Sequence, residues 1–189
     1  MAYRILALFA VLALAGCATP SVERDYDGRR DFAAYRTWSW QAPALRYRPA
    51  DDPRMASDLT ERRIRSAVAA QLEQRGLRAA PEGTPADLKV QAWLIVDERQ
   101  KQTGTPAGYW GGGSWGGPWV GPAYSEPHTV DYQVVTLQLD LFDGRDGKLV
   151  WRASMEQTPR PSRTPAQREA DIREAVAGLL AHYPPRSGR

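Results

Sequence analysis

Two long segments of the sequence alternate between apolar and polar residues, which is the pattern of a half-buried β-strand. The first covers 86–97, with these residues on one side: Leu88, Val90, Ala92, Leu94 and Val96. The second covers 129–142, with these residues on one side: Val135, Leu137, Leu139 and Leu141. The opposite sides are mostly polar, although Trp93 and Ile95 interrupt the first. This pattern predicts a sheet that helices cover on one face only.

Three shorter segments complete the predicted sheet. Residues 22–27 and 36–40 are short and rich in β-favouring side chains, and 148–156 is the return strand of a hairpin. The hairpin turn is predicted at 143–147, because this segment contains two Asp-Gly pairs. The segment 43–53 contains three prolines and is expected to be a loop.

Two helices are predicted, over 57–75 and 166–182. Ser57 or Asp58 can cap the first, and Gly76 stops it. Its expected apolar face is Leu59, Ile64, Ala67, Val68 and Leu72. The stripe of the second is Ile172, Val176, Leu179, Leu180 and Tyr183. The element order β, β, α, β, β, β, α then favours a two-layer α+β sandwich with a mostly antiparallel sheet.

The first 16 residues are typical of a signal peptide. Arg4 precedes a short apolar run, 5–14, which is too short for a permanent transmembrane helix. Leu14, Ala15, Gly16 and Cys17 resemble the bacterial lipobox in all four positions. The resemblance implies that a diacylglyceryl group is attached to the Cys17 thiol, that the signal peptidase cuts after Gly16, and that the new amine is acylated. The alternative is an ordinary secretory peptide with an accidental cysteine.

The lipobox also implies a location in the cell envelope. Ala18 follows the cysteine, and this absence of Asp resembles lipoproteins that are released to the outer membrane, where the domain would face the periplasm. Residues 17–21 form only a short tether, residues 22–185 are expected to be a single domain, and 186–189 a tail. The membrane is thus an expected partner through the lipid anchor.

Several local motifs resemble those of lipoproteins with a domain of unknown function, DUF4136. The motifs are Asp25-Tyr26-Asp27, Phe32, Tyr35, Thr37-Trp38-Ser39-Trp40, Ala86-Asp87-Leu88, Leu149-Val150-Trp151-Arg152 and Tyr183-Pro184-Pro185. Their order and spacing carry the resemblance, which extends from about Val22 to Pro185. It implies an α+β envelope lipoprotein and assigns no activity.

The segment 103–127 is rich in glycine and in aromatic residues, namely Tyr109, Trp110, Trp115, Trp119 and Tyr124. It is far longer than an ordinary hairpin connection, and exposed aromatic clusters mark contact surfaces. Three hypotheses stay open: the rings cap the open face of the sheet, insert among lipid headgroups, or contact a glycan, peptidoglycan or protein partner.

Motifs for catalysis, cofactor binding or metal binding are not found. The chain has 25 basic and 22 acidic residues, without the clustered basic face that nucleic-acid binding needs. His128 and His182 have no partner motif, and Asp25, Asp27 and Asp31 look like solvated or capping residues. Asp140, Asp143 and Asp146 gather near one hairpin, but without the spacing of a calcium loop.

Two functions are therefore compared. The first is a non-enzymatic envelope lipoprotein that binds a partner or supports an assembly, and its oligomeric state is left open. The second is a hydrolase of envelope glycan or peptidoglycan, in which paired carboxylates near the aromatic segment supply acid and base.

Overall fold

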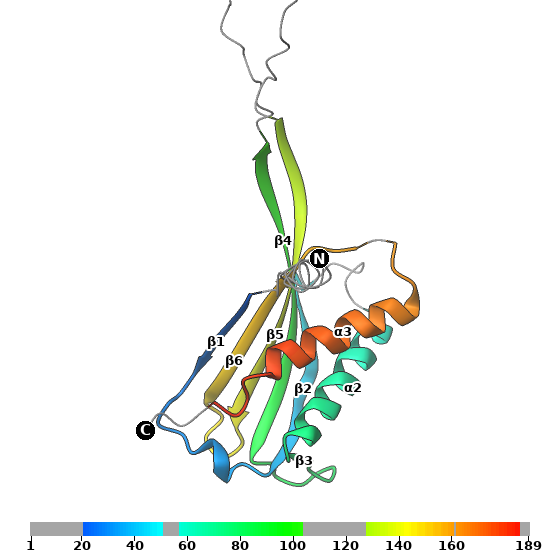
Figure 1. Ribbon diagram of the computed structural model, residues 1–189. Coiled ribbons are helices and arrows are strands. Elements are labelled where there is room, and N and C mark those ends of the chain that lie inside the picture. Colours follow the sequence, from blue (N-terminus) through cyan, green and yellow to red (C-terminus); the bar gives the residue numbers. More distant parts are fainter. Residues whose placement is uncertain (1–20, 51–56, 104–127, 161, 186–189) are drawn as a thin grey trace, which may run out of the picture.

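The computed structural model describes residues 21–50, 57–103, 128–160 and 162–185 (Figure 1). Six strands and two α-helices make up this part. In chain order the elements are β1 (Val22–Tyr26), a 3₁₀ helix η1 (Phe32–Ala34), β2 (Thr37–Arg48), α2 (Asp58–Gln74), β3 (Arg78–Ala79), β4 (Leu88–Thr103), β5 (His128–Asp143), β6 (Leu149–Gln157) and α3 (Pro165–Leu180). The predicted strands and helices are all present, but β2 and β4 continue beyond their expected ends at residues 40 and 97, and the short β3 was not predicted.

The strands form one six-stranded sheet in the order β1-β6-β5-β4-β2-β3. The β1–β6, β6–β5 and β5–β4 pairs are antiparallel, whereas β2 runs parallel to both β4 and β3. A parallel pair needs a crossover connection, and α2 supplies it between β2 and β4. Both helices lie over one face of the sheet (Figure 1). The predicted two-layer α+β sandwich with a mostly antiparallel sheet is confirmed.

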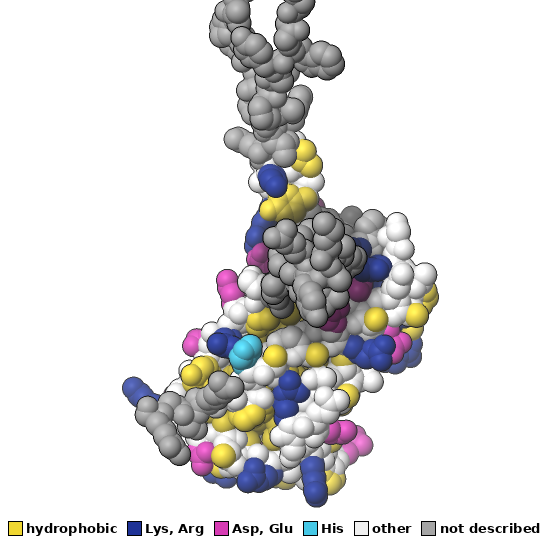
Figure 2. Space-filling model, in the orientation of Figure 1, with side chains coloured by type: hydrophobic (Ala, Val, Ile, Leu, Met, Phe, Trp, Pro, Cys, Tyr) yellow, Lys and Arg dark blue, Asp and Glu magenta, His cyan; other side chains and the backbone are white. Residues whose placement is uncertain are grey.

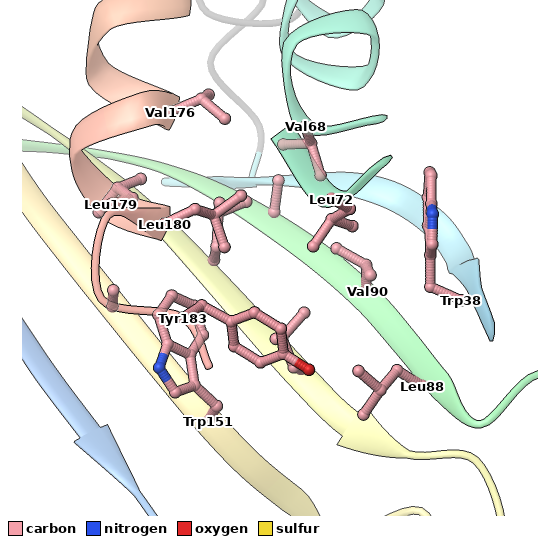
Figure 3. Packing of buried hydrophobic residues seen from close by; sticks show 14 of the residues in the cluster. Trp38, Val68, Leu72, Leu88, Val90, Trp151, Val176, Leu179, Leu180 and Tyr183 are labelled. Carbon is pink, nitrogen blue, oxygen red and sulfur yellow. The ribbon is translucent and has the colours of Figure 1, made fainter. Parts of the chain in front are cut away.

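The core lies between the two helices and this face of the sheet (Figure 3). From α2 it receives Ile64, Val68 and Leu72, which are almost fully buried, and α3 contributes Val176, Leu179 and Leu180. The sheet contributes the alternating side predicted from the sequence, with these members fully buried: Leu88, Val90, Ala92, Leu139 and Leu141. Burying a leucine, isoleucine or valine side chain contributes roughly 1.5–3 kcal/mol.

Side-chain caps fix where the helices begin and end. Ser57 accepts a hydrogen bond from the backbone N–H of Thr60 at the start of α2. Thr164 and Gln167 form a reciprocal capping box at the start of α3, where Pro165 follows the cap. At the other end, Arg75 Nε donates to the carbonyl oxygen of Leu180 at 2.7 Å, which joins the ends of the two helices.

Two local predictions are wrong. The segment 43–53 was expected to be a loop, but β2 continues to Arg48. Its register shifts between Trp40 and Leu45, so Pro43, which has no N–H to donate, lies in an irregular stretch that a sheet tolerates. Leu59 was expected on the buried face of α2, but its side chain is 55% exposed in the first turn of the helix.

Candidate functional site

The family-like motifs meet at the end of the sheet where β4 begins and β5 ends, which we call the motif end. The Phe32 ring makes edge-to-face contacts with Tyr26, Tyr35 and Tyr183, with centroids 5.9–6.2 Å apart. Trp151 makes the same kind of contact with Tyr183, with ring centroids 5.6 Å apart. The two rings lie beside each other in Figure 3. Such pairs add about 0.5–1.5 kcal/mol beyond area burial. Aromatic residues of motifs that are far apart in the sequence thus form one cluster, made of Tyr26, Phe32, Tyr35, Trp151 and Tyr183.

An ionic network closes the motif end. Asp143 accepts hydrogen bonds from Arg30 Nη1 at 3.0 Å, the Tyr35 hydroxyl at 2.9 Å and the Arg145 backbone N–H at 2.8 Å. Arg30 also pairs with Asp146 at 2.6 Å and with Asp27 at 3.4 Å. Burial, together with the bond to Asp143, raises the pKa of Tyr35 to about 12. These carboxylates already have donors, so the arrangement holds two loops together.

Asp87 ties β2 to the start of β4. Its carboxylate accepts from the backbone N–H groups of Arg36 and Thr37 and from the Thr37 hydroxyl, at 2.9–3.0 Å. The hydrogen bond from the Arg36 N–H has the largest effect in lowering the pKa of Asp87, and the bonds from the Thr37 N–H and hydroxyl lower it further. Beside it, a Cβ at Gly144 would lie 1.8 Å from the carbonyl oxygen of Ala86, so only glycine fits there. The Ala86-Asp87 motif is therefore a junction between the hairpin turn and β2.

The helix-free face of the sheet is less solvated than the alternation predicts. Asp140 is 1% exposed there and is bound by Arg152 through two bonds of 2.6 and 2.8 Å. Gln91 is also buried and donates to the Pro43 carbonyl oxygen at 3.1 Å. Asp140 therefore lies apart from Asp143 and Asp146, the other two aspartates near this hairpin, because strand alternation directs it to the opposite face from the core.

A hollow of about 420 Å³ lies on this helix-free face. It combines two arginines and three carboxylates with hydroxyl and amide groups, over the buried side chain of Ile95. Its lining residues are Ser21, Glu23, Arg48, Ile95, Asp97, Arg99, Thr136, Gln138, Ser154 and Glu156. Arg99 binds Glu156 through both guanidinium Nη atoms. The chemistry of this hollow suits a polar ligand.

Strands β4 and β5 continue beyond the rest of the sheet. β2 pairs with β4 as far as Ile95, and β6 pairs with β5 as far as Val135. From Asp97 to Thr103, β5 is the one described strand that pairs with β4, through its residues 128–134. We call residues 97–103 and 128–134 the ribbon; it projects about 20 Å at the rise of an extended strand and forms the narrow stalk in Figure 1.

The ribbon carries apolar and basic side chains on one face. Tyr132 lies opposite Arg99, and Val130 lies opposite Lys101. Tyr132 is 37% exposed and Val130 is 51% exposed, both high values for apolar side chains. Figure 2 shows apolar and basic groups along this stalk. The ribbon therefore offers a contact surface that protrudes from the domain.

Several predicted sites lie outside the described residues. These are Leu14, Ala15, Gly16 and Cys17 of the lipobox, and Tyr109, Trp110, Trp115, Trp119 and Tyr124 of the aromatic segment. Within the described part, His182 is exposed and follows the end of α3 at Leu180, although the helix was expected to continue to residue 182. No group of three or more His, Cys, Asp or Glu that suits a metal ion occurs among these residues, and no helix there is long and apolar enough to cross a bilayer.

Sequence reasoning missed the hollow and the ribbon. The residues that line the hollow come from β1, β2, β4, β5 and β6, so no local sequence motif could predict that they lie together. The ribbon was missed because the predicted strand 86–97 ends where the ribbon begins, whereas β4 continues to Thr103.

Comparison with solved structures shows the same fold in two proteins. A DUF4136 family protein from Bacteroides thetaiotaomicron is 19% identical with a TM-score of 0.54, and the match covers 89% of this chain and 97% of that one. A PDZ domain protein from Parabacteroides distasonis is 13% identical with a TM-score of 0.53, over 88% of this chain. This chain spans only 36% of that protein's length.

No curated protein matches the sequence. The family model described as a domain of unknown function, DUF4136, matches residues 22–185, which includes every helix and strand of the structure. The motifs that carried the resemblance form the packed motif end, so the match concerns the whole domain. The chain therefore belongs to the DUF4136 family.

Proposed function

We propose that this protein is a non-enzymatic lipoprotein of the bacterial envelope, anchored at Cys17 to the outer membrane and facing the periplasm. Its domain acts as a binding or assembly module. The lipobox-like sequence before Cys17 and Ala18 after it support the anchor and its location. A lipid anchor with two or more acyl chains is stable, because each buried methylene contributes ~0.8 kcal/mol.

The observation that carries the binding role is the ribbon. Two strands that leave a sheet without further neighbours bury little apolar surface, and an isolated two-stranded ribbon is marginally stable in water. Such a structure gains stability when another surface covers it. The exposed Val130 and Tyr132 are suited to that contact, for which an envelope protein, peptidoglycan or the membrane is a candidate.

The positions of the acidic residues favour a non-enzymatic role. Asp87, Asp140 and Asp143 accept hydrogen bonds from arginine, tyrosine, threonine or backbone donors within the domain. A general acid or base must instead exchange a proton with a substrate. These carboxylates stabilise the fold, as their positions between strands and loops indicate.

A Cys17→Ser variant tests the anchor. In cells fed a clickable fatty acid, the wild-type protein should be labelled and should fractionate with the outer membrane. The variant should lose the label and accumulate as the uncleaved precursor. A labelled serine variant, or an unlabelled wild-type protein, would contradict anchoring at Cys17. A Ser21→Ala variant, changed within the same tether, is the control and should behave as wild type.

An envelope-polymer hydrolase is the second candidate, favoured by the three carboxylates around the hollow. Glu156 is bound to Arg99, which leaves Glu23 and Asp97 to act on a substrate. The test is release of soluble fragments from purified peptidoglycan. We expect none from the wild-type protein; release that disappears in Glu23→Gln or Asp97→Asn would instead establish the hydrolase.

A further inference from the structure

We propose that the ribbon is a membrane-contacting element, with its Val130–Tyr132 face against the phospholipid surface that holds Cys17. The inference rests on the proposed lipid anchor and adds to it an orientation of the domain. It follows from where the chain enters the fold, how far the ribbon projects, and which side chains its two faces carry.

The chain enters the fold from the ribbon end. Val22, the first residue of β1, pairs with Met155 of β6, which pairs with Leu137 of β5, which pairs with Leu94 of β4. These four residues therefore lie at one level of the sheet. From there β1 runs toward the motif end while β4 runs toward the ribbon tip, as Figure 1 shows. The anchor thus precedes a strand that starts near the base of the ribbon and leads away from it.

The ribbon is longer than the tether. Thr103 lies nine residues beyond Leu94 along β4, so the ribbon tip is about 30 Å from the level of Val22 at ~3.4 Å per residue. Cys17 lies five residues before Val22, and five residues span at most about 18 Å. The tip therefore extends about 12 Å further than the tether can, by the same extended-chain rises.

This difference limits how the domain can sit on a bilayer. If the strands point toward the membrane, the tip enters the headgroup layer before the tether is fully stretched. If they tilt, the ribbon lies along the membrane surface. Because β1 leads away from the ribbon, turning the ribbon outward would require the tether to fold back along the domain. Contact with lipid is the outcome in the first two orientations.

The two faces of the ribbon differ as a membrane contact requires. Tyr132 and Val130 share one face with Arg99 and Lys101, and Asp97 lies on the same face at the base of the ribbon, opposite Val134. Arg99 is paired with Glu156, so Lys101 is the lysine or arginine nearest the tip on this face. Tyrosine with basic residues is typical of the membrane–water interface. The opposite face carries Glu98, Gln100, Asp131 and Gln133, all exposed. The face with Val130 and Tyr132 can meet the headgroups while the opposite, acidic face stays in water. The two faces of the ribbon therefore suit a position at the membrane surface.

Site-specific labelling tests the proposal. Cys17 is the only cysteine, and in the lipidated protein its sulfur is blocked, so an introduced cysteine is labelled alone. An environment-sensitive fluorophore is placed at Lys101→Cys, an exposed position on the Val130–Tyr132 face of the ribbon, and in a matched sample at Glu82→Cys, an exposed position toward the motif end. The full lipidated protein is reconstituted in phosphatidylethanolamine–phosphatidylglycerol vesicles, with and without brominated acyl chains.

We expect the Lys101 label to shift to shorter wavelength and to lose most of its emission in brominated vesicles, and the Glu82 label to do neither. A Tyr132→Asn change should restore much of the lost emission, whereas Gln133→Asn on the opposite face should not. Lipidated, vesicle-bound protein with equal emission at both positions would overturn this proposal and leave the anchor standing. Protein that takes up no fatty acid and does not float with vesicles would overturn the proposed function and this inference with it.

Discussion

The motif end and the ribbon are the two ends of the same sheet, and they are built in opposite ways. At the motif end, Phe32, Trp151 and Tyr183 are buried in mutual edge-to-face contacts, and Asp143 accepts three hydrogen bonds. On the ribbon, Val130 and Tyr132 lie in solvent on a structure two strands wide. The comparison indicates that folding stability is concentrated at one end and contact with other molecules at the other.

This division explains why the family-like motifs lie where they do. Residues that pack from five separate segments constrain one another, because changing one leaves its partners in a cavity or without a donor. Ribbon side chains have few such partners in the described structure, so they can be chosen for what they contact outside the domain.

The largest expected effect is on the free energy of unfolding of Trp151→Ala. The Trp151 side chain is 1% exposed and packs on Tyr183, so truncation should cost about 3–5 kcal/mol. The matched ribbon variant Tyr132→Ala should change the free energy of unfolding by less than about 0.5 kcal/mol. Urea unfolding of both purified variants measures this. Equal losses would mean that the ribbon is as integral to the fold as the motif end.

A smaller loss is expected when the buried carboxylate of the motif end loses its charge. In Asp143→Asn the amide N–H₂ meets the donors Arg30 and Tyr35, so we expect a loss of about 2 kcal/mol, the range for hydrogen bonds to charged groups. Tyr35→Phe removes only one donor and should cost about 1 kcal/mol. If Asp143→Asn unfolds at the wild-type urea midpoint, the ionic network does not stabilise this end.

How much of this arrangement the sequence predicts depends on the range of the interactions. Alternation over 86–97 and 129–142 predicts β4, β5 and the buried side of each, because burial repeats every second residue. The caps Ser57 and Gly76 predict the bounds of α2, since these signals are local. Pro43 misled the prediction for β2, because a bulge can accommodate a proline that a regular strand cannot.

The candidate sites depend on long-range contacts that local patterns do not encode. Arg30 and Asp143 are 113 positions apart, and the sequence gives no sign that they meet. Asp140 looked like a neighbour of Asp143 because the two are close in the chain, but they project from opposite faces. The ribbon emerges only from the register of three strands, β4, β5 and β6, so its length became evident with the pairing.

The smallest expected effect is on how stability changes at low pH. It distinguishes the backbone donors of Asp87 from its side-chain donor at the motif end. The pKa of Asp87 is lowered in the fold, first by the Arg36 N–H and then by the Thr37 N–H, so the folded state binds this proton less readily than the unfolded chain. The stabilisation is therefore complete above the unfolded carboxyl pKa of about 3.9 and is lost as pH falls through the lower folded value.

Asp87→Asn should accordingly lie below the wild-type protein in stability at neutral pH and approach it as the pH falls below about 4. Asp27 and Asp146, whose pKa values are also lowered, keep part of the acid sensitivity in this variant. Thr37→Val removes the hydroxyl donor but keeps both backbone donors. The difference in stability between this variant and the wild type should therefore shrink less at low pH than the difference for Asp87→Asn. Urea midpoints at a series of pH values measure both curves. An Asp87→Asn curve parallel to that of the wild type would show that this carboxylate stabilises the junction without its charge, and the motif end would then depend on packing alone.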